Sequence, residues 1–315
     1  MTSVHLSVKK LKMKKDSPCF WTRTECPVCF SSNIKTIRRG NISYKEFNHN
    51  QIKITDKDYG KIWDLNQCAD CTHVFANPCP TADYIRRLYA QIKDPSYEEE
   101  SGGRDKNFLP ILWNINGIHP KKGNILDVGA ATGIFLNSAR KYGWIPDGIE
   151  ASTWAVDTAL RKYNLKINKG AFESTPIKEN LYQAVTMIDF IEHIPNPYQA
   201  VLKAHKILTQ NGVLCLVTPN LHSLAAKISG GKWWHFRPAH IHYFSNASLH
   251  RLLERAGFKV IKTRNYTWTF SAHYLISRLA FLDFLLNSHF LSSFFRKIPI
   301  KLALGDSIEI YAQKK

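Results

Sequence analysis

Four of the seven cysteines fall into two pairs with a two-residue gap, Cys26/Cys29 and Cys68/Cys71, and thirty-eight residues separate the pairs. A two-residue gap lets both thiolates of a pair point at one ion, so two pairs complete a tetrahedral Zn²⁺ site. Alternating apolar residues between the pairs predict the short strands of a zinc ribbon. Because four thiolates leave no open coordination position, we expect this zinc to be structural rather than catalytic.

A second chemical feature is the segment DVGAATG, which occupies residues 127–133 and follows a run of aliphatic residues. Its small residues let a ligand approach the backbone N–H groups at the start of the next helix. It departs from the dinucleotide pattern Gly-x-Gly-x-x-Gly, because counting from Gly129 the second and third positions are Ala131 and Ile134. Glu150 ends another such run, and a carboxylate there can accept hydrogen bonds from two ribose hydroxyls. Since the acidic first residue of the segment suits an ammonium group, we expect a nucleoside ligand that carries one.

Three histidines and five aromatic residues lie within the twelve residues 233–244. Aromatic faces stack on sugars or planar rings, and an imidazole whose pKa is near neutrality can take up a proton. We therefore interpret the segment as the wall of an acceptor pocket, with His240 favoured as a general base over His242 and His193. The alternative is an aromatic cluster that only closes the edge of a sheet.

These residues need a scaffold, and from residue 124 onward short β-branched runs alternate with helical segments. Such alternation predicts a doubly wound α/β fold, in which ligands bind at the carboxyl ends of parallel strands. The predicted strands are 124–128, 145–149, 165–168, 184–188 and 213–217, and the predicted helices include 134–141, 153–162, 198–208 and 247–256.

Composition and charge narrow the choice of partners. The 315 residues are 44% apolar and 22% charged, which is typical of globular proteins, and the formal net charge is +18. Residues 1–40 carry nine basic and two acidic side chains, residues 41–220 twenty and nineteen, and residues 221–315 fourteen and four. The excess therefore belongs to the ends of the chain, where it suits an anionic membrane surface or a phosphorylated acceptor, and it does not by itself argue for nucleic acid.

Neither an export signal nor a membrane-spanning helix is expected. The cationic start lacks the apolar run of a signal peptide, and the most apolar segment, 274–295, is interrupted by Arg278, Asp283 and His289. An odd number of cysteines without an export signal also argues against a disulfide framework. We expect a cytoplasmic protein, with attachment to the inner membrane face as an additional possibility.

The chain resembles the class I S-adenosylmethionine (SAM)-dependent methyltransferases over about residues 83–315, through the stretches ILDVGAATG, GIEAS, MIDFIEHIPNP and NGVLCLVTPN. It is similar in particular to a bacterial group in which a CxxC–CxxC ribbon precedes the methyltransferase core and a segment like WWHFRPAHIHYFS follows the fifth strand. The resemblance implies SAM as cofactor and a Rossmann-like seven-stranded sheet. Its last two strands would be 259–264 and 307–312, the latter inserted antiparallel between the fifth and sixth.

The resemblance also implies roles for single residues. It assigns the methionine part of SAM to Asp127, Gly129, Ala131 and Gly133, the ribose to Glu150, and a position beside the sulfonium to Asp189. The chain departs from the family pattern at Ala131, near Ala171, where an acidic residue usually recognises the adenine amine, and at Gln183, where an aspartate often opens the fourth strand. We expect stacking on Phe172 or a backbone contact to recognise the adenine instead.

The core further resembles ubiquinone-type O-methyltransferases, in which an acidic-x-x-Glu-His pattern has been linked to a divalent ion. Asp189, Glu192 and His193 match that pattern. One imidazole and two hard oxygens could hold such an ion. The alternative is that the Glu-His pair only fixes the loop after the fourth strand.

The predicted organisation is a basic tail over 1–18, a zinc-ribbon domain over 19–80, a helical linker or lid over 81–120, and a methyltransferase domain over 121–315. Within the last, residues 268–303 are expected to form a helical insertion before the final strand. Apolar residues at helical spacing over 273–295 indicate packing on the core or a partner subunit, or a helix lying in the plane of a membrane.

We expect SAM-dependent O-methylation of a small molecule or of a sugar or polysaccharide precursor, by in-line displacement with a histidine base. The alternatives are an RNA methyltransferase that binds through its ribbon and basic ends, and a non-catalytic module that binds the cofactor. The fourth strand ends in Asp-Phe-Ile-Glu rather than in the Pro-Pro-Tyr type that clamps a flipped base, so nucleic acid is the less favoured partner. The sequence makes no prediction of the oligomeric state.

Overall fold

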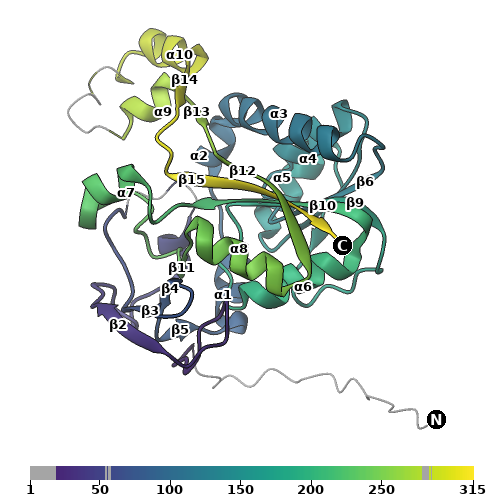
Figure 1. Cartoon of the computed structure of the whole chain (residues 1–315). Helices are drawn as coiled ribbons and strands as arrows, with labels where there is room; N and C mark the ends of the chain where they lie inside the picture. The colour runs from purple at the N-terminus through teal and green to yellow at the C-terminus, as the bar shows by residue number, and fades with distance from the viewer. Residues whose placement is uncertain (1–18, 54, 56–57, 279–283, 285) are drawn as a thin grey trace.

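A central seven-stranded sheet organises the chain in the computed structural model, which describes residues 19–315 except 54, 56–57, 279–283 and 285 (Figure 1). Its order is β12 (Phe258–Asn265), β15 (Ser307–Lys314), β10 (Leu208–Pro219), β9 (Tyr182–Ile188), β6 (Asn124–Val128), β7 (Ile145–Glu150) and β8 (Asn168–Lys169). β15 is antiparallel to both of its neighbours, whereas β10, β9, β6, β7 and β8 run parallel. The predicted α/β fold with its antiparallel last strand is confirmed. The basic tail predicted for 1–18 lies outside the described residues.

Helices cover both faces of this sheet. The helices α3 (Ser101–Ile118), α4 (Ile134–Lys141) and α5 (Thr153–Tyr163) contribute to one apolar core, and α6 (Pro197–Ile207) and α8 (Asn246–Arg255) to the other. The central strands β6, β9 and β10 consist mainly of apolar residues because both of their faces are buried. Helix α5 begins at the N-cap Ser152, whose hydroxyl accepts the N–H of Ala155, and ends at Asn164 in the left-handed region.

The edge strand β8 is shorter than the sequence predicts. Leu165 and Ile167 are buried, but only the last residue of the predicted strand, 168, pairs with β7. The register of this parallel pair would place Leu165 opposite Pro146. Because Pro146 has no N–H to donate, the ladder cannot extend in that direction.

The cysteine-bearing region forms a separate four-stranded sheet in the order β11 (His242–Tyr243), β4 (Val74–Ala76), β3 (Leu65–Cys68) and β2 (Ile34–Arg38). β1 (Phe20–Trp21) pairs with β5 (Cys79–Pro80), and η1 (His49–Ile52) and α1 (Ala82–Tyr89) complete the region. The outer strand β11 comes from the histidine-rich segment 233–244, which follows α7 (Leu224–Ser229) and η2 (Gly230–Lys232). The two halves of the chain therefore share one sheet, and the cysteine-bearing strands support the segment that contains His240.

The chain leaves the sheet between β12 and β15 to form β13 (Trp268–Ser271), α9 (Ala272–Ile276), α10 (His289–Lys297) and β14 (Pro299–Leu302). The helical spacing over 273–295 predicts one helical segment, but the described residues form two short helices, and 279–283 and 285 lie outside the description. Ser288 begins the second helix as an N-cap, since its hydroxyl accepts the N–H of Leu291 at 3.5 Å. In the described part of the chain, no helix combines the length and apolarity needed to cross a membrane.

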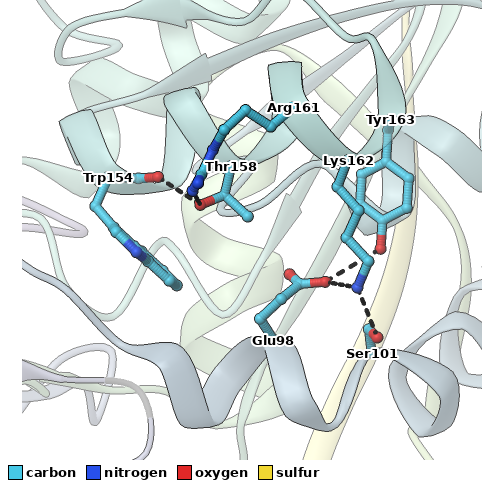
Figure 2. Close-up of polar contacts among 7 residues, drawn as sticks. All are labelled: Glu98, Ser101, Trp154, Thr158, Arg161, Lys162 and Tyr163. Carbon is cyan, nitrogen blue, oxygen red and sulfur yellow. Dashed lines mark hydrogen bonds and ion pairs between the residues drawn. The ribbon is translucent and has the colours of Figure 1, made fainter.

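The helices α2 (Pro95–Glu99) and α3 are fastened to the main domain through α5 (Figure 2). The Glu98 carboxylate binds the Lys162 ammonium group and accepts the Tyr163 hydroxyl at 3.3 Å. Lys162 also donates to the Ser101 hydroxyl at 3.2 Å. These contacts hold one wall of the cavity described below against the carboxyl edge of the sheet.

Candidate functional site

The four predicted zinc ligands come together. Their sulfur atoms all lie within 4.8 Å of one another, with 3.5 Å between Cys26 and Cys71 and 3.4 Å between Cys29 and Cys68. A tetrahedral site with Zn–S bonds of about 2.3 Å has sulfurs about 3.8 Å apart, so the cluster is close to the size that one ion needs. The hydrogen bond between Cys71 and Cys26 lowers the pKa of the Cys26 thiol to about 6 and raises the pKa of the Cys71 thiol, so it favours one thiolate of the pair.

The two cysteine pairs lie on matching turns. Phe30 and Thr72, which directly follow the second cysteine of each pair, have φ values of 64° and 60°. Their N–H groups donate to the carbonyl groups of Cys26 and Cys68 at 2.9 and 3.0 Å. Since a positive φ is uncommon outside glycine, two such turns facing each other are a specific feature of this region, and they are compatible with a zinc ribbon.

A cavity of about 510 Å³ lies at the carboxyl ends of β6, β7 and β9. Ligands bind at this edge of doubly wound sheets. Tyr97 of α2 and Arg104 of α3 also line the cavity. The predicted site residues that line the cavity are Asp127, Gly129, Ala131, Glu150, Phe172, Asp189, His193 and His240, whereas Gly133 and His242 do not.

Three carboxylates mark one end of the cavity, each at or just after the end of a parallel strand. Asp127 accepts the Thr186 hydroxyl at 2.7 Å, and Glu150 accepts the N–H groups of Ala131 and Ser152 at 2.9 and 2.7 Å. Burial raises the pKa of Asp127 and that of Asp189 to about 7, and it also raises the pKa of Glu150. Buried carboxyl groups of this kind gain most from a cationic ligand.

The loop after β6 has the backbone shape that a close ligand requires. Gly129 and Ala131 have φ values of 75° and 45°, and a Cβ on Gly129 would lie 2.9 Å from the ring of Phe190. Gly133 is the N-cap of α4, and a Cβ there would lie 3.2 Å from Ala159 and Leu165. Gly133 thus lets the loop pack on α5 and on the segment before β8, while Gly129 and Ala131 line the cavity.

Phe172 lies in the cavity wall beyond Glu150, and it is 1% exposed. Its ring meets that of Phe190 edge-on, with the centroids 6.4 Å apart. Glu173, two residues beyond Ala171, also lines the cavity. A carboxylate therefore lies close to Ala171, the position at which the family pattern usually has the acidic residue that recognises the adenine amine.

Three histidines, His193, His235 and His240, also line this cavity and make up its histidine wall. His193 and His240 meet edge-on with ring centroids 4.8 Å apart, and His235 stacks on His240 at 5.8 Å. The Nδ1 of His193 lies 2.9 Å from the carbonyl oxygen of Ala239. Burial lowers the pKa of His193 to about 4 and that of His240 well below its ordinary value, so both are neutral near pH 7.

The third candidate base, His242, lies elsewhere. Its Nδ1 is 3.1 Å from the Nε2 of His73, which directly precedes β4, and both rings are buried. His242 does not line the cavity. The structure therefore separates two histidines that are two residues apart in the sequence.

The structure groups a different set of residues from the Asp189, Glu192 and His193 of the acidic-x-x-Glu-His hypothesis. The grouped ligand atoms belong to Glu192, His193 and His240, all within 4.8 Å of one another, and Asp189 is not a member of this group. Among the described residues, the Oε1 of Glu192 and the Nδ1 of His240 are buried without a hydrogen-bond partner. One carboxylate oxygen and two imidazole nitrogens fit a divalent ion of the Mn²⁺, Fe²⁺ or Zn²⁺ type better than Mg²⁺.

Sequence reasoning did not find Arg104, which is 7% exposed and lines the cavity. Its guanidinium lies over the Tyr97 ring at 3.9 Å, and it lowers the pKa of Asp189 against the effect of burial. Arg104 belongs to no recognisable sequence motif. Its place in the cavity wall depends on how α3 packs against the sheet, which the sequence does not reveal.

His235 and Asp306 are a second missed feature. The Oδ2 of Asp306 accepts the Trp234 indole N–H at 2.8 Å and lies 3.2 Å from the Nε2 of His235. Burial raises the pKa of Asp306, but these hydrogen bonds outweigh it and hold the pKa below its ordinary value. The carboxylate fixes His235, which in turn stacks on His240.

Comparison with known proteins identifies the family. A family model described as a methyltransferase domain matches residues 104–263. The chain belongs to this methyltransferase family. The methyltransferase segment contains every predicted cofactor-contact residue and the three histidines that line the cavity, and the resemblance drawn from the sequence motifs is confirmed.

Among curated relatives of this methyltransferase, the ubiquinone biosynthesis O-methyltransferase of Pasteurella multocida is 28% identical over 141 residues, 39% of this chain and 57% of the relative. That of Rickettsia akari is 31% identical over 109 residues, 32% of this chain and 42% of the relative. The chain thus spans about half the length of the curated relatives it matches.

Solved structures similar to the chain include a SAM-dependent methyltransferase, possible histamine N-methyltransferase, of Thermotoga maritima, with a TM-score of 0.43 and 20% identity over 66% of this chain and 89% of that chain. A putative methyltransferase of Bacillus halodurans C-125 has a TM-score of 0.46 and 19% identity over 64% and 98% of the two chains.

Proposed function

We propose that the chain transfers a methyl group from SAM to a hydroxyl of a small-molecule or sugar-type acceptor. The observation that carries this proposal is that one cavity is lined both by carboxylates at strand ends and by neutral histidines. SAM has two positive groups and a ribose, which suit Asp127, Asp189 and Glu150. A hydroxyl acceptor must lose a proton, which suits the neutral imidazoles.

At the carboxylate end, the residues would bind and orient SAM. Glu150 would accept the ribose hydroxyls, and Asp189 would attract the methionine ammonium group and the sulfonium. Arg104, which also lines the cavity, would pair with the methionine carboxylate. When bound, SAM supplies an electrophilic methyl group on a positively charged sulfur.

At the histidine wall, His240 is the proposed base. It donates a hydrogen bond to the carbonyl of His235, which leaves its Nδ1 as the nitrogen that can accept a proton. The Glu192 carboxyl group adjoins both His193 and His240, and burial raises its pKa well above its usual range. An imidazolium that forms beside it would favour its ionised form. His193 is the second candidate, with its Nδ1 directed at the Ala239 carbonyl and its Nε2 3.9 Å from Glu192.

The acceptor can be identified by incubating the protein with methyl-deuterated SAM and a metabolite extract, followed by mass spectrometry. The proposal predicts a labelled hydroxyl-bearing metabolite or sugar precursor that is absent when Glu150→Ala replaces the wild type. Label in RNA would instead support the RNA methyltransferase alternative. Binding of SAM without any labelled product in extracts from the source cell would support the non-catalytic module.

We also propose that the four-cysteine cluster holds one structural Zn²⁺. Cys68→Ser is expected to reduce bound zinc from about one ion per chain to near zero and to lower the thermal midpoint, because the metal supplies folding free energy to a small domain. Metal content by mass spectrometry and a thermal melt measure both effects. The matched control is Cys19→Ser, whose thiol is outside the cluster. Equal zinc content in the two variants would contradict the assignment.

The affinity for SAM should depend on pH through Asp127 and Asp189. Their pKa values of about 7 mean that both are largely protonated at pH 5.5, and a cationic ligand favours the ionised form. Affinity is therefore expected to rise by at least about tenfold from pH 5.5 to 7.0, a range in which the methionine ammonium group stays charged. Calorimetry at each pH measures this, and Asp189→Asn should flatten the profile. A pH-independent wild-type affinity would count against the proposed roles of these carboxyl groups.

A further inference from the structure

We propose that the excursion between β12 and β15 docks the protein on an anionic lipid surface through α10. The excursion comprises the described residues of 268–304, and it stands at one end of the molecule, away from the cysteine-bearing sheet (Figure 1). This inference is independent of the proposed function.

The outer face of α10 is apolar and exposed. Phe290 and Phe294 are 76% and 52% exposed, and with Lys297 they lie four and seven residues apart, on one side of the helix. The partly buried Leu291 and Phe295 lie on the other side, where α10 packs against α9 and β13. The helix is thus held in place by one face while its aromatic face has no covering element among the described residues.

The charge around this face decides between kinds of partner. Residues 268–304 contain four basic side chains and one acidic one, and Lys297 and Lys301 follow the aromatic face directly. Protein interfaces are depleted in lysine, whereas helices that lie on membranes combine aromatic residues with lysine and arginine. The stems of these lysines can lie along the apolar surface while their ammonium groups reach lipid phosphates. An anionic membrane therefore fits the face better than a protein partner.

The excursion is also firmly attached to the main domain. The hydroxyl of Ser271 donates to the Glu100 carboxylate at 2.8 Å, and the backbone N–H of Thr269 donates to Asn107 at 2.5 Å. Arg278 donates to the carbonyl oxygen of Thr55 at 3.1 Å. Docking through α10 would therefore hold the whole domain, including the α3 wall of its cavity, in a fixed orientation to the lipid surface.

The test is co-sedimentation of the full chain with vesicles of phosphatidylcholine, with and without phosphatidylglycerol. We expect binding only to the vesicles that contain phosphatidylglycerol, and we expect it to weaken with added salt. Phe290→Ser with Phe294→Ser should reduce the partition coefficient by at least about tenfold, because both rings lose their apolar burial. Lys297→Glu with Lys301→Glu should reduce it by about tenfold as well.

The matched control is Leu224→Ser with Ile228→Ser, a second exposed apolar pair four residues apart, on α7. Its vesicle binding should equal that of the wild type, and unchanged thermal midpoints establish that all variants are folded. Unchanged binding after loss of the two phenylalanines would overturn the proposal, as would equal binding to uncharged vesicles. A dimer that dissociates when the phenylalanines are replaced, without vesicle binding, would assign the face to a second copy and also overturn it.

Discussion

Replacing His240 by alanine is expected to lower kcat by about a hundredfold to ten-thousandfold, the usual contribution of a positioned general base. The unpartnered Nδ1 of His240 is buried in the cavity wall, and burial keeps the ring neutral. The affinity for SAM should change by less than about threefold, because the cofactor-binding carboxylates are untouched. Single-turnover kinetics with the identified acceptor, together with calorimetry, separate the two quantities.

The matched control for this variant is His242→Asn. His242 is equally buried but contacts His73 outside the cavity, so its loss should lower the thermal midpoint and leave kcat of the folded protein unchanged. Wild-type kcat in His240→Ala would eliminate His240 as the base and leave His193, whose alanine variant should then show the loss. Equal losses in His240→Ala and His242→Asn would indicate a structural effect of the segment rather than a base.

Replacing Glu150 by alanine is expected to raise the Kd for SAM by about a hundredfold or more, because two hydrogen bonds to a charged group are lost. Glu150 also holds the N–H groups of Ala131 and Ser152, so its loss loosens the loop that faces the ligand. Glu150→Gln keeps one acceptor oxygen and should give an intermediate Kd. Calorimetric titration of each variant with SAM measures these values.

The control for the Glu150 series is Asp157→Asn, an exposed acidic residue on α5 outside the cavity lining. It removes the same charge from the same region and should leave the Kd unchanged. If Glu150→Ala bound SAM as tightly as the wild type, the carboxylate end of the cavity would not be the ribose site.

The carboxylate end could be predicted from the sequence because its residues stand at the ends of parallel strands. Asp127 and Glu150 follow short aliphatic runs, and neighbouring parallel strands bring such residues together whatever the details of packing. The four-cysteine cluster could be predicted from a different feature, the two-residue gaps, which set the geometry within each pair. A site can be predicted from sequence where the strand order or the residue spacing alone brings its side chains together.

The histidine wall could be predicted only in part. His240 and His242 would lie on the same side of a long strand, but β11 covers only His242 and Tyr243. His240 therefore lines the cavity, while His242 pairs with β4 and contacts His73. Arg104 and Asp306 belong to segments that reach the site only after α3 and the loop before β15 have packed. No spacing in the sequence relates these residues to the histidines.

The central claim is tested most directly by calorimetric titration of the wild-type chain with SAM at pH 7. The account predicts saturable binding of about one SAM per chain, in competition with S-adenosylhomocysteine and weakened in Glu150→Ala and Asp127→Ala. Absence of SAM binding by folded protein, or binding that neither substitution weakens, would contradict it.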